Sequence, residues 1–248
     1  MKISALVFDL DGTAVPNSPD GVPSEEVIKA VRQAQDRVSV SIATGRPITT
    51  SAHIFESLKV TAPSIISGGA QIYDPVEKRV IWEKTISKKT VNKIIEWMKP
   101  YPYGIYISDS IELIPASEIK VAQEERIIYL MNISLEDTKI LLIKLSRISE
   151  ISAHKVKSYT DGCFDIHITH YQATKKNAMQ ELLKILKVPQ SQVMVVGDGH
   201  NDLPLFKSAG LKVAMGNGSE ELKKQADYVA PSVKEDGLAK AIEKFILK

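Results

Sequence analysis

The feature that most constrains the fold is a continuously apolar run that ends at two aspartates. Apart from Ser4, residues 3–8 (ISALVF) are all apolar, and VMVV at residues 193–196 is a second such run. Runs without polar alternation are typical of strands buried on both faces, as in parallel sheets covered by helices on each side. The chain is therefore predicted to contain such a sheet.

Helix-like segments separate the apolar runs. Residues 24–35 begin with Ser24, a good N-cap, and residues 172–187 place apolar side chains at helical spacing. Strand, helix and strand in alternation imply right-handed crossovers. We expect an α/β fold, a doubly wound parallel sheet with a third strand near residues 62–69 and a closing helix at 234–247.

The middle of the chain has a different pattern. A helix candidate at 87–99 is followed by strand-like segments, and Asp161-Gly162 joins two of them, a strong hairpin signal. Antiparallel strands with two helices indicate an α+β insert. The expected division is a core of residues 1–83 and 170–248 interrupted by an α+β insert at 84–169.

Composition excludes some classes of function. The chain has 248 residues, 32 Lys and Arg against 30 Asp and Glu, and a single cysteine, Cys163. This balance predicts no nucleic-acid binding, and no apolar run approaches the roughly 20 residues that span a bilayer. The cysteine usage is compatible with a cytoplasmic protein, and the pattern carries no signal for an oligomeric state.

Polar side chains gather where the predicted strands end. Ligands of open parallel sheets bind beyond the carboxyl ends of the strands. The residues at those ends, with the two lysines that open the helix at 172–187, are Asp9, Asp11, Gly12, Thr13, Thr44, Gly45, Arg46, Ser67, Gly68, Gly69, Gly197, Asp198, Gly199, Asn201, Asp202, Lys175 and Lys176.

Four of these residues are aspartates, and carboxylates that converge in a partly dry cleft repel each other unless a cation lies among them. An all-oxygen set suits Mg²⁺, which often shares its coordination with phosphate, whereas zinc prefers His and Cys. One aspartate can attack phosphorus while its neighbour moves a proton. A lysine can offset charge in the transition state. Each motif alone also fits a turn or a helix cap, and their joint occurrence favours phosphoryl chemistry.

In order and spacing, the motifs resemble those of the haloacid dehalogenase (HAD) superfamily. Residues 9–13 (DLDGT) resemble its first motif, Thr44 in ATGR its second, Lys175 its third, and residues 197–202 (GDGHND) its fourth. The pattern is similar to the Cof-type, sugar-phosphatase-like branch, whose type II cap lies between the second and third motifs.

The resemblance implies a role for each matching residue. Asp9 is expected to be the nucleophile and an Mg²⁺ ligand. Asp11 is expected to protonate the leaving group, activate water and bind the metal through its carbonyl. Metal binding is also implied for Asp198 and Asp202.

The phosphoryl group and the substrate are expected to contact the remaining site residues, which are Thr44, Gly45, Arg46, Lys175 and Asn201. Lys176 follows Lys175, so either lysine could face the phosphate. Ser67 stands where many relatives have asparagine. Four histidines follow no metal spacing and are interpreted as structural or exposed: His53, His154, His167 and His170.

The function that follows is an Mg²⁺-dependent phosphatase that hydrolyses a small phosphorylated metabolite, a sugar phosphate or a phosphoglycolate-like acid, through an aspartyl-phosphate. Two alternatives stay open at this point. One is a phosphomutase or phosphotransferase that uses the same intermediate. The other is a signalling module that accepts a phosphoryl group without turnover.

Overall fold

A computed structural model describes residues 2–18, 20–108, 113–118 and 127–248. The central sheet is parallel and has the strand order β13-β12-β11-β1-β2. Its strands are β1 (Ala5–Phe8), β2 (Ser39–Ile42), β11 (Val193–Gly197), β12 (Leu211–Ala214) and β13 (Tyr228–Val229). β1 lies inside the sheet, between β11 and β2, so both of its edges are hydrogen-bonded.

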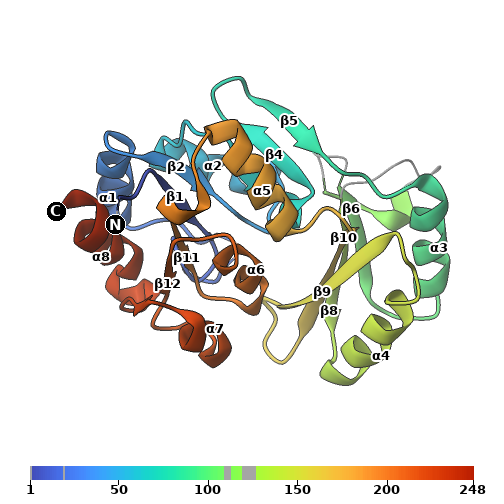
Figure 1. Ribbon diagram of the computed structural model, residues 1–248. Coiled ribbons are helices and arrows are strands. Elements are labelled where there is room, and N and C mark those ends of the chain that lie inside the picture. The colour runs from blue at the N-terminus through green and yellow to red at the C-terminus, as the bar shows by residue number, and fades with distance from the viewer. Residues whose placement is uncertain (1, 19, 109–112, 119–126) are drawn as a thin grey trace.

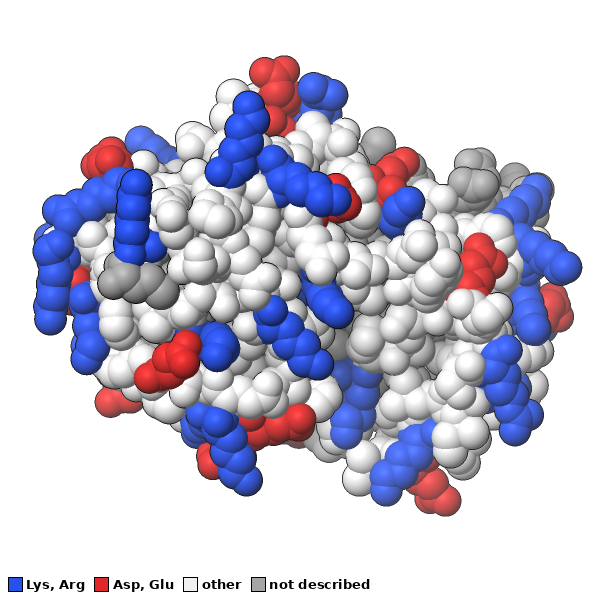
Figure 2. Space-filling model, in the orientation of Figure 1, with Lys and Arg blue, Asp and Glu red and all other residues white. Residues whose placement is uncertain are grey.

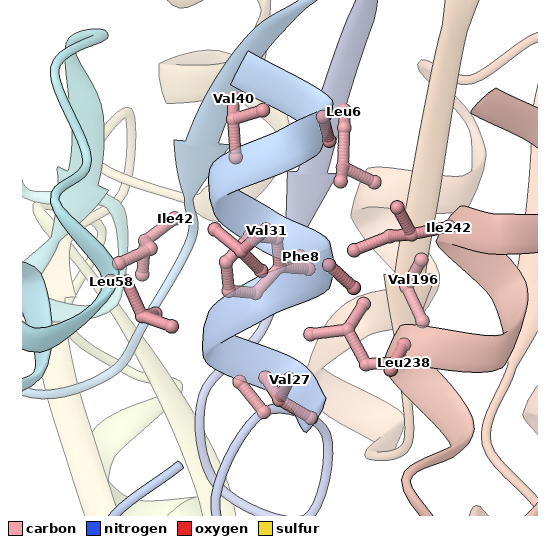
Figure 3. Close-up of a cluster of buried hydrophobic side chains, with 14 of the residues drawn as sticks. Leu6, Phe8, Val27, Val31, Val40, Ile42, Leu58, Val196, Leu238 and Ile242 are labelled. Atoms are coloured by element: carbon pink, nitrogen blue, oxygen red, sulfur yellow. The ribbon is translucent and has the colours of Figure 1, made fainter. Parts of the chain in front are cut away.

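Helices cover both faces of this sheet, which confirms the doubly wound α/β prediction. Leu6 and Phe8 of β1 pack against α1 (Glu25–Gln35), α2 (Ile48–Leu58) and α8 (Gly237–Ile242). Figure 3 shows Phe8 beneath α1, with side chains of α8 beside it. Ala5 and Val7 pack on the opposite face.

The helices of that opposite face are α5 (Lys175–Leu186), α6 (Leu203–Phe206) and α7 (Glu220–Gln225). The continuous apolar run of β1 therefore supplies both cores. Complete burial of Phe8 contributes about 1.5–3 kcal/mol. The closing helix begins at Gly237, later than expected, and continues as a π-helical turn over Glu243–Leu247.

The third predicted strand is correct as a strand, but the parallel sheet does not extend through it. β3 (Ser64–Ile66), β4 (Gln71–Asp74) and β5 (Arg79–Glu83) form a separate antiparallel sheet. Within the described residues, β3 is joined to β2 and its following residue by the bridge of Ala43 with Ile65 and by the Ile42 N–H, which donates to Oγ of Ser64 over 3.0 Å. β4 and β5 form an antiparallel hairpin.

The middle of the chain forms a five-stranded antiparallel sheet with the order β7-β6-β8-β10-β9. Its strands are β6 (Gly104–Ser108), β7 (Leu113–Pro115), β8 (Ile127–Ile133), β9 (Ile151–Lys157) and β10 (Phe164–His170). α3 (Lys88–Met98) and α4 (Leu135–Leu145) cover one face of it. We call this sheet with its two helices the cap; the domain boundaries at 84 and 169 stay a prediction.

The other face of the cap sheet is turned toward the central sheet. The Tyr129 hydroxyl of β8 donates to the Gly45 carbonyl over 3.1 Å, and His167 of β10 lies against Gly45. In Figure 1 the parallel sheet with α1 and α8 occupies one end of the molecule, and α3 and α4 occupy the other. The carboxyl ends of β1 and β2 therefore lie under the cap.

Acidic and basic side chains are mixed on the surface. In Figure 2 the Lys and Arg side chains of this face are spread over both parts of the molecule, with Asp and Glu between them. Within the described residues, no helix combines the length and the apolar character needed to cross a membrane.

Candidate active site

The first motif is a tight turn directly after β1. Asp9 continues the strand, since its N–H donates to the Val196 carbonyl over 3.0 Å. Gly12 has φ +78°, and a Cβ there would lie 2.2 Å from Oδ2 of Asp198. Only glycine combines that backbone conformation with such a close approach. The turn therefore lets the end of β11 approach the end of β1.

Lys175 lies among the carboxylates. Its Nζ donates to Oδ1 of Asp9 over 2.9 Å and to Oδ1 of Asp202 over 2.7 Å, and all three side chains are buried. Lys176, the next residue, is exposed. Of the two candidate lysines, the first faces the cluster.

The start of α5 aims Lys175. Thr174 caps the helix by accepting from the Asn177 N–H. A Cβ at Gly69, which has φ +101°, would lie 2.4 Å from the backbone nitrogen of Lys175. Gly69 therefore gives the start of α5 room to approach, which the sequence pattern did not indicate.

Asp202 holds the fourth motif together from within. Its Oδ2 accepts from the N–H groups of Asp198, over 3.2 Å, and Gly199, over 3.0 Å. Its Oδ1 faces Lys175. The Thr13 hydroxyl donates to Oδ1 of Asp198 over 3.3 Å. These contacts fix the Asp198 carboxylate next to the first motif.

Burial and crowding disfavour the ionised carboxylates. Burial, and next the charge of Asp202, raise the pKa of Asp9 well above its usual value, against the opposing effect of Lys175. The same two causes raise the pKa of Asp198 to about 7. Burial lowers the pKa of Lys175, but the charges of Asp202 and Asp9 outweigh it and the pKa rises. The cluster holds more negative charge than one lysine offsets.

A divalent cation fits this cluster. Asp9, Asp198 and Asp202 each offer a carboxylate oxygen, and these oxygens lie within 4.8 Å of one another. Opposite ligands of an octahedral Mg²⁺ ion are about 4.2 Å apart. The donors are all oxygen, as Mg²⁺ prefers. The pKa values of Asp9 and Asp198 are raised, so a cation bound between them would stabilise their ionised forms.

The Asp11 carboxylate is outside that group and pairs with Arg46. Nε of Arg46 donates to Oδ2 of Asp11 over 2.9 Å, and Nη2 donates to Oδ1. Arg46 is only 8% exposed, and its Nη2 also donates to the Ser18 carbonyl over 2.9 Å. A bidentate pair of this kind holds the carboxylate in one orientation.

A cavity of about 700 Å³ lies between the strand ends and the cap. Of the predicted site residues, its lining includes Asp9, Asp11, Gly45, Arg46, Asp198 and Asn201. Lys175 and Asp202 lie behind that wall. Thr44 is fully buried, and its Oγ1 accepts from the Arg46 N–H over 3.1 Å.

The cap contributes residues to the cavity that sequence reasoning missed. Tyr129, Tyr159, Asp165 and His167 line it, and so does His53 of α2. The Tyr129 and His167 rings meet edge to face, with centroids 4.8 Å apart. Burial is the main cause that lowers the pKa of His167, to about 4. Strand alternation places Tyr129 and His167 on one face once register is known, but no local motif marks them.

Comparisons with known proteins agree with this architecture. A family model described as haloacid dehalogenase-like hydrolase matches residues 6–113 and 110–242. The chain is 28% identical to 5-amino-6-(5-phospho-D-ribitylamino)uracil phosphatase YcsE of Bacillus subtilis, over 100% of this chain and 97% of that protein. It is 26% identical to phosphoglycolate phosphatase of Methanobrevibacter smithii, over 100% of both.

A solved structure has the same fold. A haloacid dehalogenase-like hydrolase from Bacteroides thetaiotaomicron superposes with a TM-score of 0.83 at 20% identity, covering 98% of this chain and 99% of that one. The likeness extends over both the parallel sheet and the cap.

Proposed function

Because the chain belongs to the haloacid dehalogenase-like hydrolases, as the match over residues 6–113 and 110–242 shows, we propose that it is an Mg²⁺-dependent phosphatase of small phosphorylated metabolites. The family acts on phosphate esters. The observation that carries the proposal is the convergence of Asp9, Asp198 and Asp202 on one point beside Lys175, under a cavity.

In the first half of the proposed reaction, a carboxylate oxygen of Asp9 forms a bond to phosphorus. The bond from phosphorus to the ester oxygen breaks, and Asp11 gives that oxygen its proton. Lys175 offsets charge on the cluster as the phosphoryl group arrives.

In the second half, Asp11 removes a proton from water, and the water oxygen attacks the aspartyl-phosphate. Inorganic phosphate leaves, and Asp9 is regenerated. Mg²⁺ held by Asp9, Asp198 and Asp202, and by the Asp11 carbonyl that the family resemblance adds, would supply positive charge next to the phosphoryl oxygens.

The size of the cavity supports a metabolite rather than a macromolecule as the substrate. The cap covers the strand ends, and about 700 Å³ accommodates a sugar phosphate or a smaller phosphorylated acid. The relatives named for phosphoribityl and phosphoglycolate substrates cover this range.

The test is release of inorganic phosphate from p-nitrophenyl phosphate and then from a panel of phosphorylated metabolites, with Mg²⁺ or with a chelator. Turnover should require Mg²⁺, and Asp9→Asn should lower it by at least about 10³-fold while the Tm is kept. Near-normal turnover in Asp9→Asn would reject the nucleophile. A phosphorylated acceptor sugar in place of inorganic phosphate would identify a phosphotransferase, and a long-lived phospho-form without turnover would identify a signalling module.

A further inference from the structure

A loop of the cap reaches the acid–base aspartate of the core. Residues 158–163 connect β9 to β10 and carry Tyr159, whose hydroxyl donates to Oδ1 of Asp11 over 3.1 Å. The two residues are 148 positions apart in the sequence. Tyr159 is thus a direct link between the cap and the side chain that moves the proton.

The loop is held so that Tyr159 points at the core. Asn132, at the end of β8, has φ +60°, and its Oδ1 accepts from Oγ of Ser158 over 3.0 Å and from Oγ1 of Thr160 over 2.7 Å. The residues on both sides of Tyr159 are therefore fixed to one amide.

A register shift accounts for the position of that amide. The pairing of β10 with β8 shifts between Phe164 and Ile166. The Asn132 N–H donates to Oδ1 of Asp165 over 2.8 Å. Irregularities of this kind often occur beside active sites, where they redirect a side chain.

The hydrogen bonds to Asp11 leave one place for a proton. A carboxylate offers about four lone-pair sites. Among the described residues, Arg46 uses one on each oxygen and Tyr159 uses the second on Oδ1. The free site is on Oδ2. Without the Tyr159 hydroxyl, Oδ1 would regain a free site and could take the proton instead.

We propose that Tyr159 is a positioning residue, which keeps the transferable proton of Asp11 on Oδ2 when the cap is closed. This role rests on the proposed function. As the Asp9 oxygen bonds to phosphorus and the ester bond breaks, that proton moves from Oδ2 to the leaving oxygen. Tyr159 makes the transfer dependent on the cap without itself giving or taking a proton.

Two esters of similar shape separate positioning from general support of the cap. The phenolate that leaves phenyl phosphate is basic and needs a proton as it leaves, whereas the p-nitrophenolate that leaves p-nitrophenyl phosphate needs none. General acid catalysis contributes about 10²–10⁴-fold in rate, so partial misplacement of the proton in Tyr159→Phe should lower kcat/KM for phenyl phosphate by about tenfold. For p-nitrophenyl phosphate kcat/KM should stay within about twofold.

Two further variants complete the experiment. Tyr171→Phe removes a hydroxyl from a tyrosine that is 51% exposed, and it should leave both values unchanged. Asn132→Gly permits the positive φ but removes the acceptor of Ser158 and Thr160, so it should reproduce the selective loss with phenyl phosphate.

An equal decrease for both esters in Tyr159→Phe would overturn the proposal, because it would mean that Tyr159 only supports the cap or binds substrate. No decrease for either ester would also overturn it. Absence of turnover by the wild-type enzyme on both esters and on the metabolite panel would instead reject the proposed function, and this role with it.

Discussion

The two walls of the cavity are built on different principles. The core wall concentrates charge: Asp9, Asp11, Arg46 and Asp198 line it, and Lys175 lies directly behind it, in buried contact with Asp9 and Asp202. The cap wall places uncharged groups over Gly45: Tyr129 and His167 meet through their rings and stay neutral at pH 7. Lys155, Lys157 and Asp165 also line the cap side of the cavity, and we call the part formed by Tyr129, Tyr159 and His167 the neutral wall. The charged wall suits an ion and a phosphoryl group, and the neutral wall suits the rest of a substrate.

The difference also appears in the response of the two walls to pH. Between about pH 4 and 7 the folded protein holds a proton on Asp198 that the unfolded chain has lost, so this group lowers stability as the pH rises. Between about pH 4 and 6.5 the unfolded chain holds a proton that His167 lacks in the fold, so His167 lowers stability as the pH falls. In the metal-free protein, Asp198 and His167 therefore change the stability in opposite directions as the pH rises.

The largest expected effect breaks the charged wall. Lys175→Met leaves Asp9 and Asp202 buried without their cation, which should destabilise the metal-free protein by about 3–5 kcal/mol. It should also lower kcat by at least about 10²-fold, because a group that offsets charge in the transition state is lost. Urea unfolding with a chelator and phosphate release with Mg²⁺ measure the two effects.

Lys176→Met is the matched control, because this exposed lysine is the neighbouring residue on α5. Its stability should change by less than about 0.5 kcal/mol. Equal losses in the two variants would contradict the special position of Lys175.

The same contrast explains what the sequence could predict. The charged wall follows from short contiguous motifs, because a strand end and its turn fix neighbouring residues together. DLDGT and GDGHND therefore predict Asp9 and Asp198, and the alternation of apolar strands with helices predicts the parallel sheet. The partnership of Arg46 with Asp11 was not visible, since it depends on how α2 leaves β2.

The neutral wall is discontinuous in sequence. Tyr129, Tyr159 and His167 come from two strands and a loop, and their convergence depends on register and on a shift in pairing. His167 was interpreted as structural or exposed, yet it lines the cavity. Gly69 was placed at the end of the third strand, but the room that it leaves for the start of α5 is shown by no local pattern.

The second prediction concerns the charge of Asp198, which should favour Mg²⁺ binding but lower the stability of the metal-free protein. Asp198→Asn should weaken Mg²⁺ binding at least about tenfold, since a ligand oxygen with negative charge is lost. In the presence of a chelator at pH 8 the variant should have a higher Tm than the wild type, because a buried charge is removed. Near pH 4 the difference should vanish, since Asp198 is then protonated in the fold.

Magnesium titration by calorimetry and thermal melts at several pH values check both parts. Thr13 can still donate to the asparagine oxygen, so the local fold should persist. Unchanged Mg²⁺ affinity would remove Asp198 from the metal site.

The smallest expected effect concerns the neutral wall, and its sign is opposite. Burial is the main cause that lowers the pKa of His167, followed by the positive charge of His154 and Lys175, with Asp11 acting against them. Wild-type stability should therefore exceed that of His167→Gln by more at pH 7.5 than at pH 5. A difference of 1 kcal/mol corresponds to about 2–4 °C in Tm for a chain of this size.

Melts with a chelator compare this variant with His53→Gln, which removes an exposed imidazole from the same cavity. If the two walls differ as described, the stability of the wild type relative to His167→Gln should increase as the pH rises. The stability of the wild type relative to Asp198→Asn should decrease as the pH rises. If both variants changed stability with the same sign of pH dependence, His167 would carry charge in the fold, and the cap wall would be electrostatically like the core wall. The neutral wall would then no longer support the proposal that the two walls bind different parts of a phosphorylated substrate.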